Sequence, residues 1–266
     1  MKVEPVAGER ALEISAPKAR YIVAGDLHVG IEVELERRGF WIPDQTERTL
    51  SRLVKLVVER PTDGLVLLGD VKHQFPFAGK YEARSVFRLL DALSKLLPVT
   101  VVTGNHDGGL ARMAPESVER VSSLVIGGSG PRRPDSVGLV HGHSWPPEGL
   151  MRCRTLVMAH THPSVRLCDE RGRPVTEACW LRAEFRKTET RAHYKPPYPE
   201  LIVMPAFSDL RAGYPVNGRP GRLLGPLFRN GLVNIPRSRV YLPDGTFLGH
   251  VKDLEAGQPG GGRRRE

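Results

Sequence analysis

The first half of the chain alternates short apolar runs with longer stretches in which apolar positions recur every three or four residues. The apolar runs predict buried strands at 19–25, 63–70 and 98–107. The periodic stretches predict amphipathic helices at 44–60 and 80–97. This alternation of strands and helices is typical of a parallel sheet with helical crossovers.

The stretch at 44–60 shows both a helical pattern and a start signal. Its apolar face is formed by Leu50, Leu53, Val54 and Val57. Asp44, followed three residues later by Glu47, has the form of a capping box with aspartate in place of serine or threonine. These residues predict a helix that begins at Asp44 and buries one face.

The second half of the chain is rich in strand-like segments and has few helical stretches. The segments lie at 136–143, 154–162, 163–169, 175–185 and 200–209. Turn sequences at 169–174 (DERGRP) and 242–247 (LPDGTF) predict hairpins. An α/β half followed by a β-rich half predicts an α/β fold in which two stacked mixed sheets are flanked by helices.

The composition fits one large domain. The chain has 266 residues, of which 40% are hydrophobic and 26% charged, enough to bury a sizeable core. We assign residues 1–253 to this domain and expect 254–266, rich in glycine and arginine, to form a disordered basic tail. No apolar run is long enough to cross a bilayer, and the first ten residues lack an apolar signal segment. We therefore expect a cytoplasmic protein with no membrane partner.

The net charge indicates the kind of partner, and the cysteines indicate whether the chain has disulfides or a zinc site. The net charge of +9 favours an anionic partner such as a nucleic acid or a phosphorylated substrate, although the terminal arginines supply part of the excess. The cysteines are Cys153, Cys168 and Cys179. They are odd in number and form no CxxC pair, so they match neither a disulfide framework nor a zinc site. We expect them to be buried, reduced thiols.

Polar clusters follow five of the apolar runs. In an open α/β sheet, ligands bind at the edge where the carboxyl ends of the strands meet. These clusters would gather at that edge Asp26, His28, Asp70, Asn105, His141, His160 and His162. Each cluster alone could be an ordinary polar loop, but together they supply a mixed oxygen and imidazole ligand set. Such a set suits Mn, Fe, Zn, Co or Ni better than Mg or Ca, and among these we favour Mn.

The ordered motifs DLH, GD, GNHD, HGH and HTH resemble the calcineurin-like metallophosphoesterases, whose pattern runs DxH, GD, GNH(D/E), H and GHxH. The segments 68–75 (LGDVKHQF) and 204–217 (MPAFSDLRAGYPVN) are similar to the ICC-like phosphoesterases, a group related to SbcD-type repair nucleases. The motifs cover residues 20 to 165, and these segments extend the resemblance to residue 220. The resemblance implies a four-layer αββα sandwich.

The resemblance also implies a site for two divalent metal ions and a role for each motif residue. The first ion would be held by Asp26, His28 and His162, the second by Asn105, His141 and His160, and both by Asp70. His106 corresponds to the histidine beside the substrate phosphate, and Asp107 would orient it through a hydrogen bond. A hydroxide shared by the two ions would attack phosphorus in line.

The chain departs from the family pattern at two positions. Ala159 replaces the glycine before the HxH pair, which concerns the local turn and not a ligand. His73 stands where the family's short GDxxD/N form has Asp or Asn; it would contact the second ion's water or the substrate, or be a simple loop residue. Of the HGH histidines we choose His141 as the ligand and expect His143 to support the site or face substrate. Arg211 and Asn217 are further substrate-facing candidates.

These features favour an enzyme that hydrolyses phosphodiesters. The more specific hypothesis is a nuclease that acts on DNA or RNA. Some bacterial members of the resembled group are associated with a DNA ligase and a helicase, which makes DNA-processing proteins candidate partners. The chain lacks the extra length of larger repair nucleases, so gripping long duplex would need a partner or a homodimer. The alternatives are a small-molecule phosphomonoesterase or cyclic-nucleotide phosphodiesterase and, more remotely, a non-catalytic protein-binding scaffold.

Overall fold

The computed structural model describes residues 1–75, 78–128, 133–211, 213–218 and 223–254. The first sheet follows the order β1 (Lys2–Pro5), β2 (Ala11–Ser15), β3 (Arg20–Gly25), β4 (Gly64–Leu68), β5 (Val99–Val102) and β6 (Glu119–Val121). Strands β3 to β6 run parallel, whereas β1 and β2 form an antiparallel extension. The predicted basic tail lies outside the described residues apart from its first residue, Leu254.

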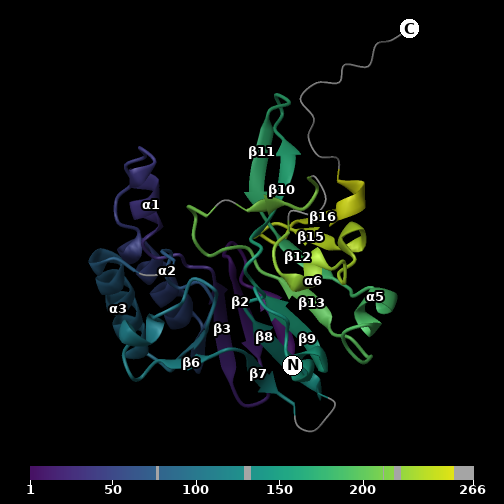
Figure 1. The fold of residues 1–266 in the computed structure, drawn as a ribbon, viewed down its shortest axis with the longest axis horizontal. Coiled ribbons are helices and arrows are strands. Elements are labelled where there is room, and N and C mark those ends of the chain that lie inside the picture. The colour runs from purple at the N-terminus through teal and green to yellow at the C-terminus, as the bar shows by residue number, and fades with distance from the viewer. Residues whose placement is uncertain (76–77, 129–132, 212, 219–222, 255–266) are drawn as a thin grey trace.

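The second sheet follows the order β16 (Phe247–His250), β15 (Arg239–Tyr241), β12 (Trp180–Ala183), β13 (Glu200–Val203), β9 (Cys153–Met158), β8 (Arg133–Val140) and β7 (Leu124–Gly127). A smaller ribbon contains β11 (Pro174–Ala178), β10 (Pro163–Cys168) and β14 (Tyr214–Pro215). The hairpin of β10 and β11 projects from the body of the molecule (Figure 1). Strands β8, β9 and β13 are parallel, so β8 and β9 also send their carboxyl ends to one edge.

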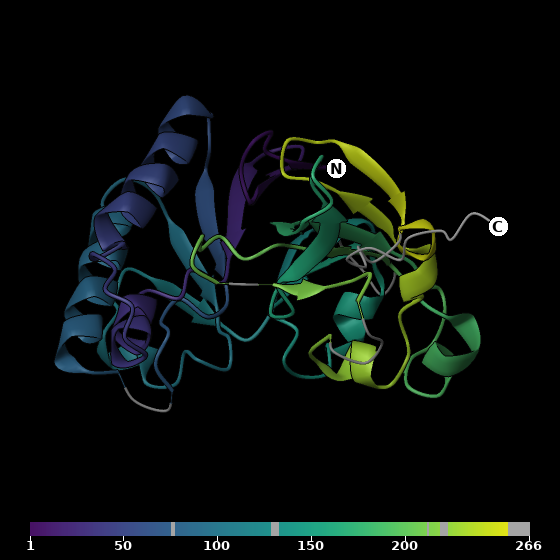
Figure 2. The ribbon, with the colours of Figure 1, turned by 90° about the horizontal axis from the view of Figure 1, so that it is seen from above.

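Helices cover the outer faces of both sheets. They are α1 (Ile31–Arg37), α2 (Thr46–Glu59), α3 (Lys80–Ser94), α4 (Glu148–Met151), α5 (Lys187–Arg191) and α6 (Pro226–Arg229), with 3-10 turns at Leu110–Arg112, Ile235–Arg237 and Val251–Asp253. Figure 2 shows α2 and α3, in blue, outside the first sheet, and the short green helix α5 on the opposite side of the molecule, beyond the second sheet. The predicted four-layer arrangement of two sheets between helices is confirmed.

The layers follow from strands that are apolar on both faces. In β4, Leu65 and Leu67 pack in the core beneath α2 and α3, while Val66 and Leu68 enter the core between the two sheets. Strand β9 divides in the same way, with Val157 in the inter-sheet core. Because successive side chains of a strand point to opposite faces, an uninterrupted apolar run supports helix packing on one side and sheet stacking on the other.

The structure corrects several local expectations. The stretch 175–185 contains two strands in different sheets, β11 and β12, separated by Cys179. Helix α2 begins at Thr46, whose N–H donates to the carboxylate of Asp44 at 2.7 Å, and Glu47 pairs with Arg88 instead of completing a capping box. The strands β1 and β2 and the helix α1 had no clear sequence signal.

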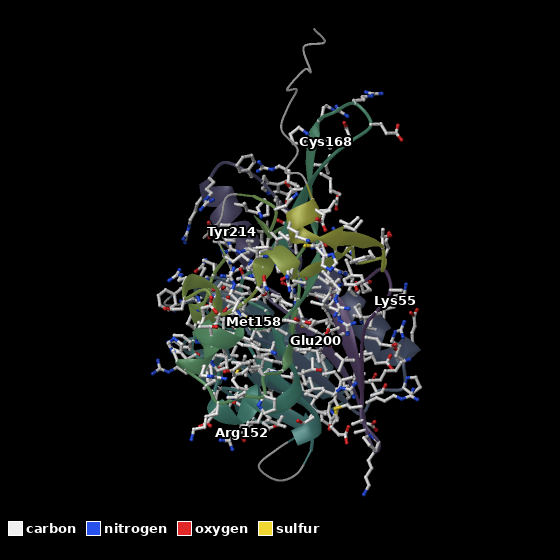
Figure 3. All side chains as sticks on the ribbon, turned by 90° about the vertical axis from the view of Figure 1, so that its right-hand side faces the viewer. Lys55, Arg152, Met158, Cys168, Glu200 and Tyr214 are labelled. Carbon is white, nitrogen blue, oxygen red and sulfur yellow. The ribbon has the colours of Figure 1, made fainter. Side chains whose placement is uncertain are left out.

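The cysteines are free, as expected, but they are not all buried. Cys153 and Cys179 are buried, and burial raises the pKa of the Cys179 thiol. Cys168 is exposed because it ends strand β10 on the projecting hairpin, where Figure 3 labels it. Among the helices that the structure describes, none is long and apolar enough to cross a membrane.

Candidate metal centre

The polar clusters follow the carboxyl ends of β3, β4, β5, β8 and β9, as the sequence predicted. Backbone hydrogen bonds join the first two clusters, since the Asp26 N–H donates to Gly69 O at 3.1 Å and the His28 N–H to Asp70 O at 2.9 Å. The two sheets also approach closely here: a Cβ added to Gly25 would lie 3.0 Å from the Cβ of Ala159. The close approach brings clusters from both sheets together.

The backbone of the clusters is held in an unfavourable conformation. Five non-glycine residues have positive φ, between 43° and 66°, in the part of the chain that the structure describes: Asp26, His28, Asp70, His160 and His162. Positive φ costs free energy for such residues and gathers at functional sites. All five are predicted metal ligands, so the strain lies where their side chains are aimed inward.

The first group of candidate ligands is Asp26, His28 and His162, whose donor atoms lie within 4.8 Å of one another. The Nε2 atom of His162 is 3.1 Å from Asp26 Oδ2 and 3.4 Å from Nε2 of His28. Burial alone would raise the pKa of Asp26, but His162 and His141 hold it well below its ordinary value. Burial lowers the pKa of His28 well below its usual range. A carboxylate beside a neutral imidazole is the ionisation state that metal binding requires.

The second group is Asp70, His141 and His160, again within 4.8 Å. Nε2 of His141 lies 3.5 Å from Asp70 Oδ2 and 2.9 Å from Asp26 Oδ1, across the boundary between the sheets. Asp70 Oδ2 is also 3.9 Å from Nε2 of His28, which places Asp70 between the two groups. Burial lowers the pKa of His160 to about 3 and keeps its imidazole neutral.

Asn105 adds an oxygen without a partner. Its Oδ1 is buried and accepts no hydrogen bond from any residue that the structure describes. A buried polar atom of this kind requires an explanation, and a bound cation supplies one. Together, the two groups and Asn105 offer mixed carboxylate, amide and imidazole donors, so these residues fit two divalent transition-metal ions.

The glycines of the GD and GNHD motifs leave room for these side chains. A Cβ at Gly69 would lie 2.2 Å from Cδ2 of His141, and Gly69 also has a φ of +76°. A Cβ at Gly104 would lie 2.2 Å from Asp70 Oδ1 and 2.9 Å from Cε1 of His141. Both positions therefore require glycine for steric reasons.

The Gly104→Ala substitution should displace Asp70 and lower activity by about 100-fold or more, because ångström-scale misplacement of a site has effects of that size. Gly149→Ala is the matched control, since no atom lies within 4 Å of a Cβ added there. Steady-state rates with Mn²⁺ would check the expectation. Equal rates in the two variants would contradict the steric account.

His106 and Asp107 take different partners from those expected. The backbone N–H of His106 donates to Asp70 Oδ1 at 2.9 Å. In the ring of His106, Nδ1 forms a hydrogen bond with the carbonyl of His73. The carboxylate of Asp107 instead accepts backbone N–H groups from Val71 at 2.9 Å and Gly104 at 2.7 Å. Asp107 therefore joins the loops after β4 and β5, and the His73 carbonyl, not Asp107, bonds to the His106 ring.

The remaining candidates divide into two sets. His143 is exposed, with Nδ1 3.1 Å from Nδ1 of the buried His141, which fits the choice of His141 as ligand. The charge of Arg211 acts on His28 and His73, and its buried Nε finds no acceptor among the described residues. Asn217 has a structural role instead of the expected substrate-facing one, because its amide bonds to the backbone N–H and carbonyl of Arg166.

A family model for calcineurin-like phosphoesterases matches residues 19–218, a span that contains both ligand groups. The chain belongs to this family. Calcineurin-like phosphoesterases depend on two metal ions, and the Asp and His groups of this chain occupy the corresponding motifs. The family assignment makes this chain a hydrolase of phosphoester bonds.

Two solved structures are similar to this chain at low sequence identity. The nuclease MPE of Pseudomonas putida has 21% identity and a TM-score of 0.50, covering 91% of this chain and 98% of its own. The Escherichia coli phosphoesterase Yfce has 18% identity and a TM-score of 0.41, covering 86% of this chain and 96% of its own. No curated protein sequence matches the chain.

Sequence reasoning missed two glutamates near the calcineurin-like motifs. Glu34 in α1 lies 2.5 Å from Nε2 of His73, and His73 is itself only 3% exposed. Glu82 in α3 is fully buried and accepts the backbone N–H groups of His73 and Gln74. Neither residue belongs to a motif, so the sequence carried no signal beyond their charge.

Proposed function

We propose that this protein is a dinuclear-metal-dependent phosphodiesterase, and more specifically a nuclease that cleaves DNA or RNA. The observation that carries the proposal is the position of Asp70 between two ligand groups, with Nε2 atoms of His28 and His141 at 3.9 and 3.5 Å. A carboxylate placed in this way can be shared by two ions. Two bound divalent ions would supply an activated water and neutralise charge on the phosphate.

Residues of the chain would position the phosphate and the leaving group. His106 is half-buried, and its Nε2 faces the site at 4.0 Å from Asp70 Oδ2. The His73 carbonyl only accepts, so Nδ1 of His106 carries the proton in that hydrogen bond and Nε2 is the ring nitrogen left for the substrate. In the protonated ring, Nε2 also carries a proton, which it could give to the leaving oxygen or use to stabilise developing charge. The Nε of Arg211 has no acceptor in the part of the chain that the structure describes, and it suits a phosphate oxygen because arginine binds such oxygens through its N–H groups.

Two observations support nucleic acid over a small phosphomonoester. The net charge of +9 favours a polyanionic substrate. Phe75 is 67% exposed beside His106, with ring centroids 6.2 Å apart, so an aromatic surface lies next to the site where a base could stack. The P. putida protein of the same fold is a nuclease, which makes nucleic acid the first natural substrate to test.

We expect the protein to hydrolyse bis-p-nitrophenyl phosphate with Mn²⁺ and to lose this activity in excess chelator. The monoester p-nitrophenyl phosphate is the matched substrate, followed by single- and double-stranded DNA and RNA. Cleavage of the monoester alone would replace the proposal with a phosphomonoesterase. Failure both to bind two ions and to cleave any ester would favour a protein-binding scaffold.

A further inference from the structure

We propose that Glu34 and His73 form a positioning pair that fixes the ring of His28 for metal binding. The pair lies outside the ligand set, and neither residue contacts the phosphate in this proposal. The inference rests on the metal dependence in the proposed function, but it concerns ion affinity and not the choice of substrate.

The observation behind the proposal is a continuous chain of short contacts from helix α1 to the metal centre. Glu34 Oε2 lies 2.5 Å from Nε2 of His73, and Nδ1 of His73 lies 3.3 Å from Nδ1 of His28. The remaining ring nitrogen of His28, Nε2, faces His162 at 3.4 Å. His28 thus presents one nitrogen to the first ligand group and the other to His73.

The order of donors and acceptors from Glu34 through His73 determines the tautomer of His28. A carboxylate only accepts, so the Nε2 of His73 must carry the proton that it shares with Glu34. The Nδ1 of neutral His73 is then an acceptor, and it accepts a hydrogen bond from the protonated Nδ1 of His28. The Nε2 of His28 is left with a free lone pair, which is the form that coordinates a metal ion.

Both members of the pair are held in place by the surrounding fold. The other oxygen of Glu34 forms an ion pair with Arg38, the residue that directly follows α1. The backbone N–H of His73 donates to Val29 O at 3.0 Å and to Oε1 of Glu82 at 2.7 Å. A buried ring supported in this way loses little conformational entropy when it orients a neighbour.

The closest competing interpretation is that His73 is itself a ligand. His28, His73 and His106 also have donor atoms within 4.8 Å of one another. However, the Nε2 of His73 is engaged by Glu34, and its Nδ1 is directed at a ring nitrogen of His28. The Nδ1 of His106 is likewise occupied by the His73 carbonyl. These contacts favour positioning over coordination.

Calorimetric titration of the full chain with Mn²⁺ tests the pair. We expect Glu34→Ala to weaken binding of one ion by about 10- to 100-fold without changing the number of ions bound, the usual effect of losing a partner behind a ligand. Glu34→Gln should lose less, because its amide oxygen can still accept from His73. Glu36→Gln, an exposed change on the same helix, should bind like wild type.

Thermal melting of the metal-free Glu34→Ala and His73→Asn proteins is the check that these variants fold. Unchanged Mn²⁺ affinity in Glu34→Ala would overturn the proposal, and loss of one ion in His73→Asn would make His73 a ligand and also overturn it. If wild type binds two ions and Glu34→Ala binds one of them weakly, yet no diester is cleaved, the proposed function fails while the pair stands.

Discussion

Replacing Asp70 with asparagine should lower kcat/KM with Mn²⁺ by about 1000-fold or more, equivalent to about 4 kcal/mol of transition-state stabilisation. Asp70 Oδ2 faces Nε2 atoms of His28, His141 and His106 at 3.9, 3.5 and 4.0 Å, so its negative charge lies between the two ligand groups. Asparagine keeps an oxygen for the His106 N–H and removes only the charge. Rates and Mn²⁺ affinity should fall together.

The matched control is Asp91→Asn, a charge change on helix α3 where Asp91 pairs with Lys95. The metal-free Asp70→Asn protein should melt no lower than wild type, because a buried negative charge has been removed. Full activity in Asp70→Asn would refute the shared-ligand arrangement. A fall in activity with an equal fall in melting temperature would instead indicate misfolding.

The His106→Ala variant should retain both ions and lose about 100- to 10,000-fold in kcat, the range for removal of a general acid or base. The side chain of His106 is 21% exposed, and its ring stacks on that of His73 with 5.8 Å between the centroids. His106 belongs neither to the ligand group of Asp26 nor to that of Asp70, so it lies at the border of the site. His250→Ala, a change far along the chain, is the control. Weakened ion binding in His106→Ala would show that His106 is a ligand.

The leaving group separates the two roles that His106 could have. If its Nε2 donates a proton, His106→Ala should lose much less activity with bis-p-nitrophenyl phosphate than with a dinucleotide, whose alkoxide leaving group needs that proton. If its Nε2 stabilises charge on the phosphoryl oxygens, the two substrates should lose activity equally. The ratio of the two losses is the measurement that decides.

The segment 204–217, after β13, resembled a family segment in the sequence, but its contacts could not be predicted from that resemblance. Phe207 is fully buried in the core beneath α2, and its N–H donates to Gly25 O at 2.8 Å. Asp209 pairs with Arg48 and Arg52 of α2 at 2.9 and 3.3 Å. The segment therefore crosses from the second sheet to the first, which brings the charge of Arg211 near enough to lower the pKa of His28. Contacts of this kind join distant parts of the chain and leave no local pattern.

The short helix α1 illustrates the limit of pattern reading. Its seven residues have only Ile31 and Glu32 buried, so they show no helical apolar face that a sequence search could detect. Its place beside the site depends on Gly30, which has a φ of +91° and admits Glu82 where a side chain would clash. Glu34 reaches His73 only because α1 folds back over the loop after β4.

The sequence by itself determined the apolar strands β3, β4, β5, β8 and β9, their polar ends and the family motifs, because each of these is a local property of the chain. An apolar run of five residues predicts a buried strand, and the residue type after it decides which metal chemistry is available, as with Asp26 and His28. The tertiary structure decided which of these side chains form hydrogen bonds with one another. His141 meets Asp26 across 115 residues, Asp107 bonds to backbone and not to His106, and Asn217 bonds to strand β10. Hydrogen bonds form over about 3 Å, so these pairings depend on how the sheets stack, which no local pattern encodes.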